Sequence, residues 1–167
     1  YNISYEGGML VVSVTVSGRV REIVSANIDI VAKVLRNGTE EKFESDTFKS
    51  GDDMYLYFKS PVDGYLTVYL LDETTQEVFC LLPYKASGEG AYKIEHDKPY
   101  VLFSTEKETR NSHEVDEYTM TCKREKEFND LYIIFSPHHF TKANLNDTTN
   151  ETLPRQLSYE EFVRWLV

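Results

Sequence analysis

The sequence lacks the short motifs that mark the commonest enzyme active sites. It contains no glycine-rich phosphate loop, no G-x-S-x-G turn around a serine, no H-E-x-x-H zinc motif and no C-x-x-C pair. Each of these patterns sets reactive groups at the spacing that nucleotide, hydrolytic or zinc chemistry needs. We therefore expect a protein that is not an enzyme, with no catalytic residues, no bound metal and no cofactor.

Cysteine is scarce as well, because Cys80 and Cys122 are the only two in 167 residues. Each lies within an expected strand, so one disulfide between neighbouring strands and two separate buried thiols both stay open. We expect both cysteines to be structural. Cys80 stands next to Phe79 and Leu81, and apolar surroundings raise the pKa of a thiol, which argues against a nucleophile.

Basic residues are fewer than acidic ones, 18 against 28, which gives a net charge of −10. Such a surface repels phosphate backbones and anionic lipid, so nucleic acid is not an expected partner. No apolar run reaches the length of a transmembrane helix, and we do not expect the chain itself to span a membrane. The chain begins at Tyr1 rather than Met, and we expect either a removed leader or further domains upstream.

Aromatic and aliphatic residues are densest over residues 51–84. Residues 54–59 and 65–71 have strand length, and residues 60–64 between them predict a tight hairpin in which an Asp-Gly pair supplies a positive φ. Residues 78–82 predict a third strand after a polar link. Three consecutive antiparallel strands are the expected centre of the fold.

The rest of the chain predicts shorter strands and a helical end. The further strands are expected at residues 9–16, 25–35, 91–95, 100–104, 117–123 and 131–135. Residues 105–116 are charged and predict a solvated loop. We expect a single all-β domain over residues 1–167, an immunoglobulin-like β-sandwich of about seven to nine strands. A long loop at 136–157 and a short C-terminal helix at 159–167 complete it.

The C-terminal helix has a clear local signature. Ser158 and Glu161 form a capping box, in which each side chain bonds to the backbone N–H of the other residue. Leu157 before the cap and Phe162 after it form a hydrophobic staple. Phe162 and Trp165 share one stripe of the helix, so we expect it to dock on a sheet with Leu157, Phe162 and Trp165 largely buried.

The long loop holds the best candidates for a metal or catalytic site. His138 and His139 are adjacent, with Asp147 and Glu151 downstream. Adjacent histidines on extended backbone point in opposite directions, so one metal ion reaches both only across a bend. We favour two ordinary loop histidines over a metal-dependent enzyme that uses the His138–Glu151 loop.

The remaining polar candidates are expected to be structural. Residues 144–151 offer oxygen ligands, but they lack the glycine and carboxylate spacing of a calcium loop, and turn formation explains them as well. His96 and His113 stand singly among charged residues, and we expect both to be solvated surface groups.

Tyrosines alternate with apolar residues along the two central strands. Tyr55 and Tyr57 share one face of the first strand, and Tyr65 and Tyr69 share one face of the second. Rigid aromatic area with a polar tip is typical of protein interfaces and of sugar-binding platforms. We expect these four residues to form the binding surface, unless a second sheet, the long loop or the terminal helix covers it.

Several short patterns are spread over residues 25–167. They are Gly51-Asp52, Tyr55-Leu56-Tyr57, Asp63-Gly64-Tyr65-Leu66, Val68-Tyr69, Leu81-Leu82-Pro83, Leu131-Tyr132-Ile133-Ile134-Phe135-Ser136-Pro137, Phe140-Thr141-Lys142-Ala143, Leu153-Pro154 and the end at 158–165. Together they resemble the bacterial domain-of-unknown-function 4384 family, in the form found in Bacteroidetes envelope proteins. The resemblance implies an all-β module attached to other domains such as kinases, caspase-like peptidases or envelope lipoproteins. It implies no known activity and no catalytic residues.

The sequence thus predicts a non-catalytic interaction or accessory module of a bacterial cell-envelope protein, periplasmic or envelope-associated. Its expected partners are a protein or glycan in the envelope and other domains of the chain upstream of Tyr1. The alternatives are a glycan-binding domain that uses the tyrosine face and the metal-dependent enzyme described above.

Overall fold

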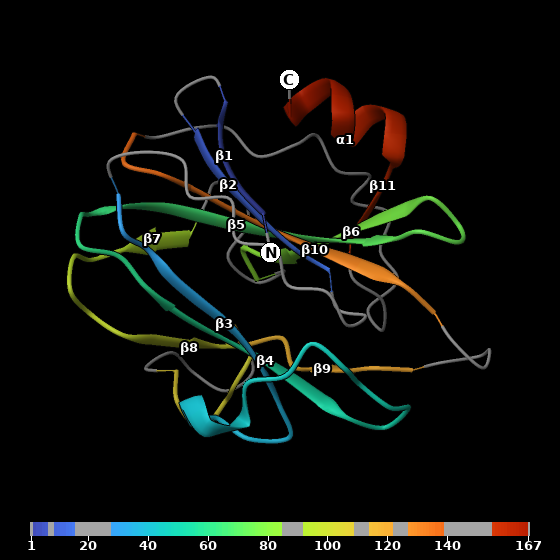
Figure 1. The fold of residues 1–167 in the computed structure, drawn as a ribbon, viewed down its shortest axis with the longest axis horizontal. Coiled ribbons are helices and arrows are strands. Elements are labelled where there is room, and N and C mark those ends of the chain that lie inside the picture. The colour runs from blue at the N-terminus through green and yellow to red at the C-terminus, as the bar shows by residue number, and fades with distance from the viewer. Residues whose placement is uncertain are drawn as a thin grey trace.

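The chain folds into two β-sheets and one C-terminal helix. The computed structural model describes residues 2–6, 9–15, 28–84, 92–108, 114–121, 127–138 and 155–166 (Figure 1). The strands are β1 (Asn2–Glu6), β2 (Met9–Thr15), β3 (Val31–Arg36), β4 (Asp53–Lys59), β5 (Gly64–Asp72), β6 (Glu77–Leu82), β7 (Tyr92–Ile94), β8 (Tyr100–Leu102), β9 (Tyr118–Thr119), β10 (Asn129–Ser136) and β11 (Arg155–Ser158). A short 3-10 helix, η1 (Glu41–Phe43), follows β3, and the helix α1 (Tyr159–Leu166) ends the fold.

The larger sheet has seven strands and the smaller sheet has four. In the larger sheet the order is β1-β2-β10-β5-β6-β11, and β7 pairs with β5. In the smaller sheet the order is β3-β4-β8, and β9 pairs with β4. Strand β10, whose apolar run predicts a buried strand, lies between β2 and β5, where Ile133 is paired with Val12 and Val68.

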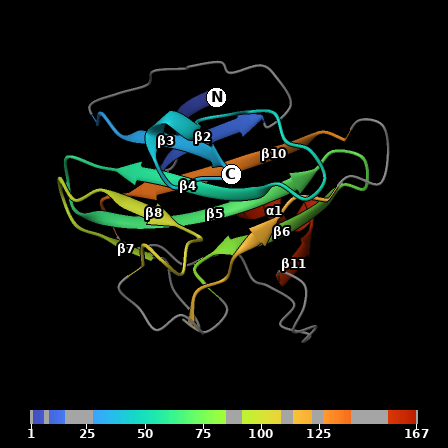
Figure 2. The same ribbon diagram turned by 90° about the horizontal axis from the view of Figure 1, so that it is seen from below.

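The main core lies between the two sheets, which Figure 2 shows one in front of the other. Leu66 and Val68 of β5 and Ile133 of β10 face Leu56 and Phe58 of β4, and all five are fully buried. Each such side chain contributes about 1.5–3 kcal/mol when it leaves water. The prediction of an all-β sandwich is confirmed at this level.

A second apolar cluster covers the other face of the larger sheet. Tyr69 of β5, Val78 of β6 and Ile134 of β10 pack there against Leu157 and Phe162. The part of the larger sheet formed by β5, β6 and β10 is therefore buried on both faces, by the smaller sheet on one side and by α1 on the other (Figure 1).

The predicted hairpin between β4 and β5 is wrong. The two strands belong to different sheets, so residues 60–63 form a crossover from the smaller sheet to the larger one. Ser60 Oγ donates to the Val62 carbonyl oxygen at 2.8 Å and organises this bend. The hairpin between β5 and β6 is confirmed, since Asp72 accepts hydrogen bonds from Thr74 N–H and Gln76 N–H at 2.9 Å each.

The described residues contain eleven strands. Two of these strands were not predicted from the sequence. Strand β1 pairs with β2 and precedes the first expected strand, at residues 9–16. Strand β11 pairs with β6 in the last part of the predicted 136–157 loop. The count therefore exceeds the expected seven to nine, and the immunoglobulin-like connectivity stays a prediction.

The capping box at the start of α1 is confirmed. Glu161 N–H donates to Ser158 Oγ at 3.2 Å, and Ser158 N–H donates to Glu161 Oε2 at 3.1 Å. The bond from the Ser158 backbone lowers the pKa of the Glu161 carboxyl, since it favours the charged form. Leu157 and Phe162 are buried as predicted, whereas Trp165 is half-buried.

We expect Ser158→Ala to lower the free energy of unfolding by about 1 kcal/mol, because the first turn of α1 loses its side-chain acceptor. Urea denaturation measures the change. Ser158→Thr keeps a hydroxyl at the same place and is the control, with a midpoint near that of the wild type. Equal loss in both variants would contradict the capping role.

Candidate functional site

The outer face of the smaller sheet presents two of the four predicted tyrosines. Along β4, Met54, Leu56 and Phe58 point into the core, so Tyr55 and Tyr57 point to the opposite side. Both tyrosines are half-buried. Their rings therefore combine a fixed position in a sheet with partial access to solvent.

The pairing of strands sets the neighbours of these rings. Tyr57 is paired with Lys33 of β3 and with Val101 of β8, and both of these side chains are also half-buried. Lys59 lies two residues further along β4 on the same side. We call the surface formed by Tyr55, Tyr57, Val101, Lys33 and Lys59 the Tyr55/Tyr57 face.

Charges of both signs border the Tyr55/Tyr57 face. Lys33 Nζ lies 2.8 Å from Glu41 Oε2 in η1, and the Tyr57 side chain is hydrogen-bonded to the same carboxylate. Burial, and after it the charge of Glu41, raises the pKa of the Tyr57 phenol. Burial, and after it the charge of Asp53, raises the pKa of Tyr55. Both phenols therefore stay neutral at physiological pH and offer rings and hydroxyls rather than an ionised base.

Tyr65 and Tyr69 do not lie on this face. They belong to β5 in the larger sheet, on the side opposite to the main core. The expectation of one surface formed by all four tyrosines is wrong, and binding by Tyr55 and Tyr57 stays a prediction. Alternating apolar residues fit a hairpin and fit equally two strands that face each other across a core.

Tyr69 is covered by α1 and has an exposed fraction of 0%. Its ring centroid lies 5.1 Å from that of Phe162 and 5.4 Å from that of Trp165. Phe162 also contacts the ring of Tyr132, at 5.0 Å between centroids. Of the three elements that the sequence analysis considered as possible covers, the terminal helix is the one that covers Tyr69. Tyr65, at the start of β5, is half-buried.

The histidines are placed unequally. His138 is exposed just after β10, where its backbone N–H donates to Ser136 Oγ at 3.1 Å. His139, Asp147 and Glu151, the other residues of the candidate metal site, lie outside the described residues, as do His113 and all of residues 144–151. Among the residues that the structure describes, no group of three His, Cys, Asp or Glu side chains is placed to hold a metal ion.

His96 is exposed as expected, but it is also bonded. Its backbone N–H donates to Asp63 Oδ1 at 2.7 Å, and its ring Nδ1 lies 2.7 Å from the same oxygen. The two residues are 33 positions apart, on the connections between β4 and β5 and between β7 and β8. Nothing local in the sequence signals this pair.

Cys80 is buried in the cluster beneath α1, next to Tyr69 and Val78. Its thiol lies 3.5 Å from the carbonyl oxygen of Leu82. Cys122 lies outside the described residues, so the relation between the two cysteines stays a prediction.

A partly buried network around the Glu108 carboxylate was also missing from the sequence prediction. The Tyr84 hydroxyl donates to Glu108 Oε1 at 2.6 Å and accepts a bond from Phe103 N–H at 2.9 Å, while Tyr92 donates to Glu108 Oε2 at 3.1 Å. Burial, and after it the charge of Glu108, raises the pKa of Tyr84 far above its usual value. The network ties the residues after β8 to the core, although the sequence predicts a solvated loop there. Its role is therefore structural.

Comparisons of the chain with protein-family models, with curated proteins and with solved structures find no match. The resemblance to the bacterial family named above therefore stays a prediction. In the part of the chain that the structure describes, no helix is both long and apolar enough to cross a membrane.

Proposed function

We propose that this chain is a non-catalytic interaction module of a bacterial cell-envelope protein, and that it binds another protein through the Tyr55/Tyr57 face. The observation that carries the proposal is the pair of half-buried tyrosines on the outer side of β4, held in register with Lys33 and Val101. Ordered aromatic rings of this kind are the commonest anchors of protein interfaces, since they bring large contact area at little cost in side-chain entropy. The envelope setting is supported by the family resemblance.

The surroundings of the rings favour a protein over a glycan as the partner. Lys33, Lys59 and Glu41 border Tyr57, and the charges of Asp53 and Glu117 act on Tyr55. An aromatic centre within a rim of mixed charge is the usual anatomy of a protein interface. A neutral glycan makes little use of such a rim.

The ionisation of the tyrosines also agrees with recognition. Because burial raises the pKa of Tyr55 and of Tyr57, neither phenol loses its proton near neutral pH. Each hydroxyl is therefore a hydrogen-bond donor and acceptor at the edge of an apolar ring, which suits binding rather than proton transfer.

We expect Tyr55→Ala and Tyr57→Ala each to weaken partner binding by about 1–2 kcal/mol, or about 5- to 30-fold in Kd, with a small effect on folding. The purified chain captures its partner from a detergent-solubilised Bacteroidetes envelope fraction. Mass spectrometry identifies the partner, and titration with the purified partner gives Kd. Tyr65→Ala is the matched control, since Tyr65 is a half-buried tyrosine of the other sheet.

Two results would oppose the proposal. Equal affinity in the Tyr55→Ala, Tyr57→Ala and control variants would place the contact elsewhere on the domain. Binding to a glycan array that is lost in the same two variants, without any captured protein, would support the glycan-binding alternative instead.

A further inference from the structure

Two crossovers run side by side at one end of the sandwich. Residues 60–63 carry the chain from β4 in the smaller sheet to β5 in the larger one, and residues 95–99 carry it back from β7 to β8. The flanking strands are paired at both ends, since β5 pairs with β7 and β4 pairs with β8. The crossovers therefore form a stacked pair that connects the two sheets.

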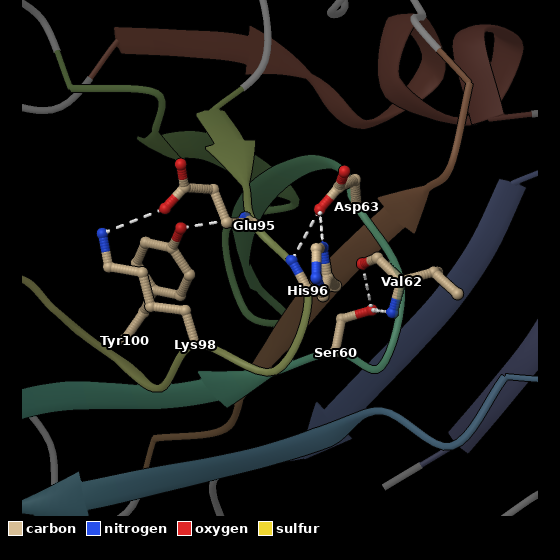
Figure 3. A network of polar contacts seen from close by, with 7 residues as sticks. All are labelled: Ser60, Val62, Asp63, Glu95, His96, Lys98 and Tyr100. Atoms are coloured by element: carbon tan, nitrogen blue, oxygen red, sulfur yellow. Dashed lines mark hydrogen bonds and ion pairs between the residues drawn. The ribbon is translucent and has the colours of Figure 1, made fainter.

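Hydrogen bonds join the two crossovers, and Figure 3 shows those between Asp63 and His96. Asp97 N–H donates to the Ser60 carbonyl oxygen at 2.7 Å. Asp63 Oδ1 lies 2.7 Å from both the backbone nitrogen and the ring Nδ1 of His96. One carboxylate oxygen thus holds the main chain and the side chain of the same residue, and the contact to the ring is the one that titrates near neutral pH.

The charges around His96 favour its protonated form. On its own crossover, Glu95 and Asp97 are neighbours, and Asp63 faces it from the other crossover. Of the positive groups nearby, the charge of Lys93 acts on Asp63, while Lys98 Nζ lies 3.4 Å from Glu95 Oε2 and over the ring of Tyr100. The imidazole is therefore surrounded mainly by carboxylates.

We propose that Asp63 and His96 form a pH-sensitive clamp, which holds the two crossovers together more firmly in mildly acidic than in alkaline solution. The clamp is independent of the proposed binding face, because it rests on the crossovers and not on the outer side of β4. It acts locally, since the exposed fractions of the two side chains are 67% for Asp63 and 65% for His96. Water and salt screen such a pair, so its contribution to the stability of the fold is expected to be small.

The direction of the pH effect follows from the two ionisations. The hydrogen bond to Asp63, and after it the charge of Asp63, raises the pKa of His96, so the contribution is complete below about pH 6.5 and is lost as the pH rises through the raised pKa. The backbone bond from His96 lowers the pKa of Asp63, so this contribution is present above about pH 4 and is lost as the pH falls further. The clamp is strongest between these limits.

His96→Asn tests the clamp, because its side-chain amide replaces the Nδ1 donor without titrating. Between about pH 5.5 and about pH 8.5, the Tm of the wild type is expected to fall by about 1–3 °C more than the Tm of His96→Asn. His138→Asn is the control, since it removes another exposed histidine outside the clamp and should keep the wild-type pH dependence.

A second measurement follows the ring of His96 directly. An NMR titration of the wild type and of Asp63→Asn is expected to give a lower His96 pKa in the variant, because the carboxylate charge is gone while an acceptor oxygen remains. The same His96 pKa in both proteins would overturn the proposal. So would an identical Tm change with pH in the wild type and in His96→Asn.

Discussion

We expect Phe162→Ala to lower the free energy of unfolding by about 3–5 kcal/mol relative to the wild type. Phe162 is fully buried in α1 and packs on the rings of Tyr69 and Tyr132 at about van der Waals contact, 5.1 and 5.0 Å between centroids. Removal of its ring opens a cavity and exposes Tyr69, which belongs to the same buried cluster. Urea denaturation at fixed pH measures the loss.

Tyr159→Ala is the matched control in the same helix. Tyr159 is 41% exposed, so the loss of its ring should change the free energy of unfolding by no more than about 0.5 kcal/mol. Trp165 is half-buried, and its replacement by alanine should cost less than that of Phe162. Equal midpoints for Phe162→Ala and Tyr159→Ala would show that α1 does not stabilise the larger sheet.

The helix was predictable because its signals are local. The capping box joins Ser158 to Glu161, three residues away, and the apolar stripe repeats within two turns. The surface that α1 covers was not predictable. It depends on a contact between Phe162 of α1 and Tyr69 of β5, which are far apart in the sequence. Sequence spacing carries no information about such a contact.

The strands were predictable as elements, but their sheets were not. Alternation with a period of two identifies β4 and β5, and short apolar runs identify β6 and β10, from the sequence pattern alone. It does not say whether consecutive strands pair or face each other, because both arrangements bury one side of each strand. The bend after β4 therefore suggested a hairpin where the chain in fact changes sheets.

The candidate site was predictable in part for the same reason. Tyr55 and Tyr57 follow from alternation along β4, but their neighbours Lys33 and Val101 depend on pairing with β3 and β8. The contact of Asp63 with His96 depends on the stacking of two crossovers. Both arrangements are set by the tertiary fold, so no short stretch of sequence predicts either of them.

Gly64 shows how a local rule can give the right residue for the wrong reason. The sequence assigns it to a tight turn that needs a positive φ. Among the described glycines, Gly51 has such a value, at 94°, and Gly64 does not. Instead, Gly64 begins β5 against β10, where a Cβ would lie 2.4 Å from the Phe135 ring and 2.5 Å from the Ser136 carbonyl oxygen. Close packing of backbone on backbone is what requires glycine here.

Gly64→Ala is therefore expected to lower the free energy of unfolding by about 3 kcal/mol, at the upper end of the usual cost of overpacking. The Phe135 ring can rotate, but the Ser136 carbonyl belongs to the backbone, so the start of β5 has to move away from β10. In a Gly64→Ala, Phe135→Leu double variant, the smaller side chain relieves the contact with the ring alone. The double variant should thus lose less stability than the sum of the two single variants, with a coupling of about 0.5–1 kcal/mol in urea denaturation. A Gly64→Ala midpoint that matches the wild type would show that β5 does not approach β10 this closely.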